Sequence, residues 1–319
     1  MKRFLLRLLT LGVVTALALV AAEFGLRFVF RHAKSSGNAR NYIGVAHPVP
    51  AVRVNNVGFR DRDVPPRSSA YRIAVVGDSF TWGQGIEQKE RYSDLLEQAL
   101  GPGYEVFNFG KPGNNMPEHL DVLTQALAIH PDFVLLQLYI NDWETPQMER
   151  PAMPPLLPTP LEGTLEGHSL LYDLLVNQIQ TLEEKTGLVD NYVAYMARNL
   201  RDPNLPNAKQ AYGQLAEFFD RAHAAHVGVG AVLFPAPDAL GPYGRDYPFG
   251  YLHEGTARVC ENKQVPFLDL LPIYVTVADP RSLWVDPFDA HPNAISNRMA
   301  ADAILKRFRS VWSRDNIRR

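Results

Sequence analysis

Cysteine is almost absent from this 319-residue sequence, and neither sign of charge is in excess. The single cysteine, Cys260, excludes a disulfide within the chain and a zinc site built from several cysteines. Lysine and arginine number 32 against 34 aspartate and glutamate residues, so a net charge of −2 provides no positive field to attract a polyanion. Nucleic acid is therefore not an expected partner. The hydrophobic content of 46% is ordinary for a folded protein.

Long apolar runs are also scarce, with one exception at the amino terminus. Basic residues up to Arg7 precede Leu8–Ala22, which contains no charge. At about 1.5 Å per residue this run covers roughly 23 Å of a hydrocarbon layer ~30 Å thick, which fits the apolar region of a signal peptide. The apolar character continues over Phe24–Phe30, however, and Arg7 and Arg27 could extend to opposite interfaces. This continuation favours an uncleaved anchor.

Residues 1–30 are therefore expected to form a membrane anchor or signal segment. Residues 31–70, rich in Ser, Asn, Pro and charge, are expected to be a tether with little packing. The folded part would then lie on the exported side, periplasmic or extracellular. Cleavage after Ala22 would instead give a secreted protein, and basic residues on both sides of the apolar run leave the charge rule for orientation nearly balanced.

From Tyr71 onward, apolar runs typical of strands alternate with helical patterns. The runs are Ile73–Val76, Glu105–Phe109, Phe133–Tyr139, Val229–Phe234 and Val265–Leu268, and helices are expected at 90–100, 117–129, 208–226, 250–263 and 293–312. This alternation predicts an α/β fold with a parallel sheet covered on both faces. Pro292 suits the first turn of the last helix, because its missing N–H would be unsatisfied there anyway.

The interval 143–207 is too long to be a plain connection and is expected to be an insertion. Six prolines fall within 146–160, a helical pattern follows from Ser169 to Lys185, and a polar loop comes after it. An insertion at the carboxyl edge of such a sheet is either a lid or substrate wall, or a surface excursion. Its sequence does not decide between them.

Small and polar residues follow the first three expected strands, as Gly77-Asp78-Ser79, Gly110 and Asn141. Because the carboxyl ends of parallel strands share one edge of the sheet, these residues are expected to lie close together. Ser79 would begin a helix, where free N–H groups and the helix dipole favour negative charge, so it is either a helix cap or a nucleophile. The N–H groups of Ser79 and Gly110 and the amide of Asn141 would together form an oxyanion hole.

A base and its orienting carboxylate are available in Asp286–Asn293. Serine attack needs a neutral imidazole to take the hydroxyl proton and a carboxylate to fix the ring, and His291 fits the first role. Asp289 lies two residues before His291, and Asp286 lies five before it. An Asp-rich turn ahead of a helix is the plain structural alternative.

These residues, in this order, resemble the SGNH (GDSL-like) hydrolase superfamily from about Tyr71 to the final helix, at about 313. The nucleophile motif, oxyanion glycine, oxyanion asparagine and base match, respectively, Gly77-Asp78-Ser79, Gly110, Asn141-Asp142 and His291. The resemblance implies a three-layer α/β/α sandwich with a five-stranded parallel sheet, flavodoxin-like in order. The leader, the tether and the stretch 56–61 are similar, more weakly, to membrane-anchored bacterial members.

The resemblance implies an ester hydrolase that forms an acyl-serine on Ser79, with His291 as base, and that deacylates a carbohydrate or a lipid. One position departs from the family pattern: the usual aspartate, three residues before the histidine, is Phe288 here. We assign the acid to Asp289 and hold Asp286 in reserve. A two-residue spacing resembles the polysaccharide O-acetyltransferase branch, so an O-acyltransferase acting on a cell-envelope polysaccharide is an alternative function.

A third possibility is a catalytically inert module that binds a ligand or glycan at the same sheet edge. No cofactor is expected, because Gly83-x-Gly85 lacks both the dinucleotide pattern and the lysine of a phosphate loop. No metal is expected either, because no acidic cluster accompanies His223 and His226. The expected partners are a small-molecule or glycan acyl ester and, through the amino terminus, a membrane.

Overall fold

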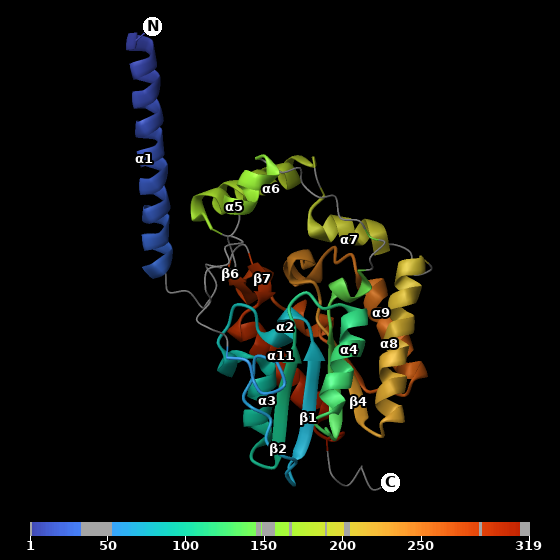
Figure 1. Cartoon of the computed structure of the whole chain (residues 1–319). Coiled ribbons are helices and arrows are strands. Elements are labelled where there is room, and N and C mark those ends of the chain that lie inside the picture. The colour runs from blue at the N-terminus through green and yellow to red at the C-terminus, as the bar shows by residue number, and fades with distance from the viewer. Residues whose placement is uncertain are drawn as a thin grey trace. The chain divides into compact units, whose positions relative to one another are not determined.

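The computed structural model describes residues 2–32, 53–144, 148, 157–165, 168–188, 190–200, 205–286 and 289–312 (Figure 1). The chain forms two compact units. One consists of Met1–Ala51 with Pro151–Asp190, and the other of Val52–Arg150 with Asn191–Arg319. The second unit contains the sheet and most of the helices.

Five parallel strands form the sheet in the order β2-β1-β3-β4-β5. Their bounds are Tyr71–Gly77 (β1), Tyr104–Gly110 (β2), Phe133–Leu138 (β3), Gly228–Leu233 (β4) and Phe267–Asp269 (β5). Every residue of β1 is buried, which is the reason its sequence is continuously apolar rather than alternating. The five strands expected from the sequence are all present, and their ends differ by at most two residues.

Helices cover both faces of the sheet, which confirms the three-layer α/β/α architecture. Successive residues of β1 point to opposite faces, so Ile73 and Val75 pack in one half of the core, and Ala74 and Val76 in the other. The first half contains α3 (Tyr92–Leu100) and α11 (Ala294–Phe308), and the second contains α4 (Met116–Leu127), α8 (Pro206–Ala224) and α9 (Gly250–Asn262).

Shorter elements lie at the ends of strands and in the connections. Single helical turns are α2 (Ser79–Trp82), α10 (Leu271–Tyr274), η1 (Gln88–Glu90), η2 (Ile140–Trp143), η3 (Pro237–Ala239), η4 (Pro242–Gly244) and η5 (Pro280–Leu283). A two-stranded antiparallel hairpin of β6 (Trp284–Asp286) and β7 (Asp289–Pro292) precedes the last helix.

The last helix begins within one residue of its expected start, but the expected role of Pro292 was wrong. Pro292 ends β7 and is not in the first helical turn. Asn293 is the N-cap, and its side chain accepts hydrogen bonds from the backbone N–H groups of Ile295 and Ser296. An asparagine cap satisfies two of the free N–H groups of the helix, so it is a stronger start signal here than proline.

The interval 143–207 is not a single insertion. The helical pattern from Ser169 corresponds to α6 (Leu170–Thr186), with α5 (Thr159–Leu165) before it. The polar loop expected after it contains a further helix, α7 (Tyr192–Leu200), whose Tyr195 and Met196 are buried in the core of the second unit. Apolar residues spaced by three and four positions over this stretch were the available signal.

The expectation of a tether over residues 31–70 does not hold for 53–64. Phe59 is buried in the core, and its ring lies 4.5 Å from that of Phe109, centroid to centroid. Asp61 is buried as well. Residues 33–52 lie outside the described part of the chain. The stretch 53–64 therefore belongs to the folded unit rather than to a linker.

A continuous helix, α1 (Lys2–His32), begins the chain. Its segment Lys2–Phe28, with a mean hydropathy of 2.3, is long and apolar enough to cross a membrane by length and composition. A signal sequence would meet the same two criteria.

Candidate active site

Ser79, His291 and Asp289 form one hydrogen-bonded line. The Nε2 atom of His291 lies 2.9 Å from Ser79 Oγ, and its Nδ1 atom is hydrogen bonded to Asp289 Oδ1. Asp289 Oδ1 also accepts the backbone N–H of His291 at 3.0 Å. The ring of Phe80 packs edge-on to the imidazole, with 5.5 Å between the ring centroids.

The strands that carry these residues explain the hydrogen bonds between them. Ser79 begins α2 and is separated from the buried strand β1 by one residue, whereas His291 and Asp289 lie on β7 of the hairpin. Residues two apart on a strand point to the same face, so the carboxylate and the imidazole are neighbours. Burial acts to raise the pKa of Asp289, but its hydrogen bonds to His291 outweigh burial and lower that pKa. Asp289 is therefore a carboxylate at neutral pH, as the orienting role requires.

The reserve acid, Asp286, lies on β6, with its Cα paired across the hairpin to that of Asp289. Its side chain and Phe288 lie outside the described part of the structure. Asp289 is the residue hydrogen bonded to the His291 ring.

Ser79 does not cap its helix. The side chain of Asp78 takes that role, accepting the N–H of Phe80 at 2.8 Å. The Ser79 hydroxyl is thus left to face His291 Nε2. The helix itself, α2, has only four residues, so its dipole contributes little at Ser79, contrary to the expectation from the sequence.

The three expected oxyanion donors follow neighbouring strands, but two of them already have acceptors. Gly110, paired with Gly77 across β1 and β2, donates its N–H to the side chain of Asn108 at 2.9 Å. Asn141 Nδ2 donates to the Asn114 carbonyl at 2.9 Å. An amide nitrogen carries two N–H bonds, so Asn141 retains a second one for a ligand.

Gly110 also has a packing role. A Cβ at this position would lie 2.2 Å from the backbone nitrogen of Trp82, because α2 crosses directly over the end of β2. No side chain fits there without displacing the short helix that begins with Ser79.

Gln137 was not predicted as a site residue. It is fully buried on β3, and its Oε1 atom accepts the backbone N–H of Asp78 at 3.1 Å and the hydroxyl of Thr81 at 2.7 Å. It therefore binds both ends of the turn formed by residues 78–81, the Ser79 turn. A lone amide within an otherwise apolar strand was the signal that could have identified it.

The buried titratable side chains near the Ser79 turn include Asp78, His119 and Asp142. His119 Nε2 lies 2.8 Å from Asp142 Oδ1. Burial, with the nearby charge of Asp142, raises the pKa of Asp78 to about 6. Burial opposes protonation of His119, but the charges of Asp142 and Asp78 outweigh it and raise the pKa of His119. A histidinium at this position compensates the buried carboxylates.

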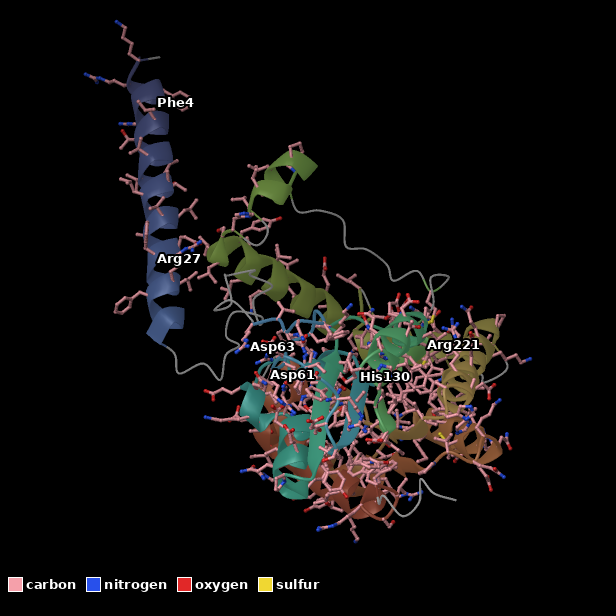
Figure 2. All side chains as sticks on the ribbon, turned by 60° about the horizontal axis from the view of Figure 1, so that its bottom comes forward. Phe4, Arg27, Asp61, Asp63, His130 and Arg221 are labelled. Carbon is pink, nitrogen blue, oxygen red and sulfur yellow. The ribbon has the colours of Figure 1, made fainter. Side chains whose placement is uncertain are left out.

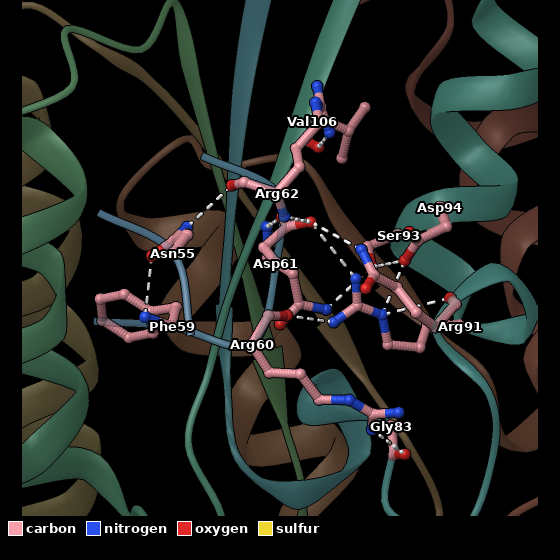
Figure 3. Close-up of polar contacts among 12 residues, drawn as sticks. Asn55, Phe59, Arg60, Asp61, Arg62, Gly83, Arg91, Ser93, Asp94 and Val106 are labelled. Carbon is pink, nitrogen blue, oxygen red and sulfur yellow. Dashed lines mark hydrogen bonds and ion pairs between the residues drawn. The ribbon is translucent and has the colours of Figure 1, made fainter. Parts of the chain in front are cut away.

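The stretch 53–64 supports the same turn (Figure 3). The Arg60 guanidinium donates to the carbonyl oxygens of Trp82 and Gly83, at 3.1 and 2.8 Å. Asp61 accepts the backbone N–H of Asn108 at 2.7 Å and lies 3.4 Å from Arg91, which in turn donates to the Arg60 carbonyl. These contacts of Arg60 and Asp61 were not predicted, because the stretch was expected to be a tether.

Among the described residues, no group of three or more His, Cys, Asp or Glu side chains is arranged to hold a metal ion. His223 and His226 do not share a helix face. His223 lies in the last turn of α8, which ends at Ala224, and His226 follows with a left-handed φ of 56°.

Comparison with known proteins gives one family. The sequence profile of the GDSL-like lipase/acylhydrolase family matches residues 75–299, which is more than half of the chain. An acetylxylan esterase of Xylanibacter ruminicola is 36% identical over 86 residues, which make up 24% of this chain and 18% of that protein. The chain thus matches less than a fifth of the length of that relative.

The solved structures with a similar fold include two esterases. The psychrotrophic esterase EstA from Pseudoalteromonas sp. has a TM-score of 0.45 and 16% identity, covering 76% of this chain and 98% of its own. A catalytic mutant of the acetylxylan esterase Axe2 from Geobacillus stearothermophilus has a TM-score of 0.45 and 14% identity, and the match covers 78% of this chain and 99% of the Axe2 chain.

Proposed function

The chain belongs to the GDSL-like lipase/acylhydrolase family, and from this premise we propose that it hydrolyses acyl esters through an acyl-serine intermediate on Ser79. The observation that carries the proposal is the hydrogen-bonded line from Ser79 Oγ through His291 to Asp289. A serine used only to cap a helix would need no imidazole at its hydroxyl, and here Asp78 already provides the cap.

In the proposed reaction, Ser79 Oγ attacks the ester carbonyl carbon while its proton passes to His291 Nε2. Asp289 stabilises the imidazolium. The oxyanion accepts hydrogen bonds from the Ser79 N–H and the Asn141 amide, and the Gly110 N–H becomes a third donor when its hydrogen bond to the Asn108 side chain breaks. The tetrahedral intermediate expels the alcohol, which takes the proton from His291. Water, deprotonated by the same imidazole, then attacks the carbonyl carbon of the acyl-enzyme. The second tetrahedral intermediate breaks its bond to Ser79 Oγ, which takes the proton back from His291, and the carboxylic acid is released.

The proposed substrate is an acyl ester of a carbohydrate or a lipid. Similarity over 86 residues to an acetylxylan esterase favours a carbohydrate. A panel of acetyl and longer-chain esters of sugars and glycerol, assayed with the full chain, tests this. Preference for acetylated sugars is expected, and exclusive cleavage of long-chain glycerol esters would contradict it.

An O-acyltransferase is the second candidate, in which a sugar hydroxyl replaces water in the second half of the reaction. The specific observation in its favour is the two-residue spacing of Asp289 and His291 on β7. Turnover of an acetyl ester, measured with and without an oligosaccharide acceptor, separates the two. Free acetate as the only product supports the hydrolase, and acetylated acceptor supports the transferase.

A fluorophosphonate separates an enzyme from an inert binding module. We expect it to label the folded chain, to fail with Ser79→Ala, and to label Ser282→Ala normally, since Ser282 is an exposed serine outside the line. Absence of label in the folded wild-type chain would favour the binding module.

For localisation, we propose that α1 anchors the chain with its catalytic unit on the exported side. The apolar segment Lys2–Phe28 supports an anchor by length and composition. A reporter fused to the carboxyl terminus should be active on the exported side, and activity in the cytoplasm would reverse the orientation. The mass of the mature chain decides between an anchor and a cleaved leader.

A further inference from the structure

An acidic residue interrupts the apolar helix α1. Glu23 follows the uncharged run Leu8–Ala22 and lies within the segment Lys2–Phe28. Its carboxylate accepts the backbone N–H groups of Leu170 and Leu171, at 3.1 and 2.9 Å, and the hydroxyl of Ser169 at 3.0 Å. The first residues of α6 are therefore bound to the membrane-length helix.

Arg27 completes this junction. Its Nε donates to Glu23 Oε1 at 2.6 Å, and its Nη2 donates to the carbonyl of His168 at 2.8 Å. Figure 2 shows Arg27 on α1 beside the start of α6. Acidic residues are costly within a membrane segment unless they are paired, and here each carboxylate oxygen has partners from Arg27 or from the start of α6. Free N–H groups at a helix start are natural partners for a carboxylate.

The depth of the junction follows from helix geometry. From Arg7 to Arg27 the helix advances about 30 Å at ~1.5 Å per residue, which equals the thickness of the hydrocarbon layer. Glu23 lies four residues before Arg27, so its backbone is about 6 Å inside the layer when Arg27 is at its edge. Helices that lie in the membrane interface are buried by roughly 5–10 Å, the depth at which α6 begins.

Exposed leucines occur along α5 and α6 and just beyond them. Leu161, Leu175, Leu182 and Leu188 are 50%, 53%, 61% and 77% exposed. Leu175 and Leu182 lie seven residues apart, which places both on one face of α6. The two helices contain more acidic than basic residues, so attraction to anionic lipids does not explain such a surface. Apolar contact with lipid does.

We propose that α6 lies in the lipid interface, with Leu175 and Leu182 toward the acyl chains, and that Glu23 binds its first turn to the membrane-spanning helix. The occupant of the leucine surface is thus the bilayer into which α1 inserts. The inference rests on the proposal that α1 spans the membrane. It does not depend on the chemistry at Ser79.

Lipid-borne quenching tests the proposal in the full chain, reconstituted in phosphatidylcholine nanodiscs. A Cys260→Ser background carries a single fluorophore at Leu182→Cys, and the matched control is Gln180→Cys, about 200° away around α6. Nitroxides on the lipid acyl chains should quench the fluorophore at position 182 several times more than the one at position 180. Equal quenching at the two positions, weak or strong, would overturn the proposal.

Glu23→Gln tests the junction. Without the charge, the quenching at position 182 should fall towards that at position 180, while the chain stays in the nanodisc. The control is Glu217→Gln, which removes a carboxylate of the same type, paired with Arg221 four residues later on α8. This control should leave quenching unchanged. Unchanged quenching in Glu23→Gln would refute the role of Glu23.

Hydrolysis of a soluble acetyl ester, measured on the same nanodiscs, keeps the two proposals apart. Hydrolysis without preferential quenching at position 182 would overturn the membrane contact alone. Preferential quenching without hydrolysis would overturn the esterase proposal alone.

Discussion

Asp289 and His291 lie two residues apart on β7, and one carboxylate oxygen of Asp289 accepts hydrogen bonds from both the backbone N–H and the ring Nδ1–H of His291. The alternation of side chains along a strand makes this contact possible, because positions i and i+2 share a face. The hairpin of β6 and β7 therefore accommodates the two-residue spacing, and the aspartate usual at position 288 is not needed for the contact.

The acid is tested by two matched substitutions. Asp289→Asn preserves volume but favours the wrong imidazole tautomer, so turnover should fall by up to ~10⁴-fold, whereas Asp286→Asn should have a much smaller effect. Ester turnover of both variants, with thermal melts to exclude misfolding, measures this. Near-normal turnover in Asp289→Asn together with collapse in Asp286→Asn would move the role to Asp286.

Asn141→Ala should lower turnover by ~10²-fold or more, because a donor to the oxyanion is lost mainly in the transition state. A modest loss of stability is also expected, since Asn141 Nδ2 holds the Asn114 carbonyl. Asn199→Ala is the control, because its Nδ2 likewise donates to a carbonyl, that of Tyr195, away from the Ser79 turn. If both variants lost stability alone, with normal turnover per folded molecule, Asn141 would be only structural.

Gly110→Ala should destabilise the fold by about 1–3 kcal/mol, because the new methyl group would overlap the backbone of Trp82. Displacement of α2 should lower turnover as well. Gly103→Ala, where nothing lies within 4 Å of the added Cβ, should leave the melting temperature nearly unchanged. Equal melting temperatures for the two variants would contradict the close packing at Gly110.

His119 should make stability depend on pH. Its pKa is raised in the folded state, so its contribution is fully present below the unfolded value of about 6.5 and is lost as pH rises through the folded pKa. The free energy of unfolding of the wild type, relative to His119→Gln, should therefore decrease above pH 6.5. Asp78, whose pKa rises from 3.8 to about 6, titrates mainly below that window.

Denaturant titrations from pH 6.5 to 9 measure this difference. His223→Gln is the control, because it removes an exposed imidazole of α8 by the same substitution. A stability difference between wild type and His119→Gln that increases with pH would contradict a stabilising imidazolium.

Much of the fold and part of the site could be predicted from the sequence. Strands buried on both faces are continuously apolar, so β1 and β3 are visible without any structure. The rule that parallel strands share a carboxyl edge then places Ser79, Gly110 and Asn141 close together. Helix α7 was not predicted, although its apolar residues have helical spacing. The hydrogen bonds from Arg60 to Trp82 and Gly83 were not predicted either, because the polar composition of the stretch indicated a linker.

The sequence by itself determined which elements form and which chemical groups end them, because periodicity and strand ends are local properties. Only the tertiary structure decided which groups meet. Ser79 and His291 are 212 residues apart, and their contact depends on how the hairpin packs against the sheet edge. The same is true of Gln137, which accepts the N–H of Asp78 from 59 residues away, and of Arg60, which donates to the carbonyl of Gly83. Such long-range pairings depend on three-dimensional packing, which no local pattern in the sequence encodes.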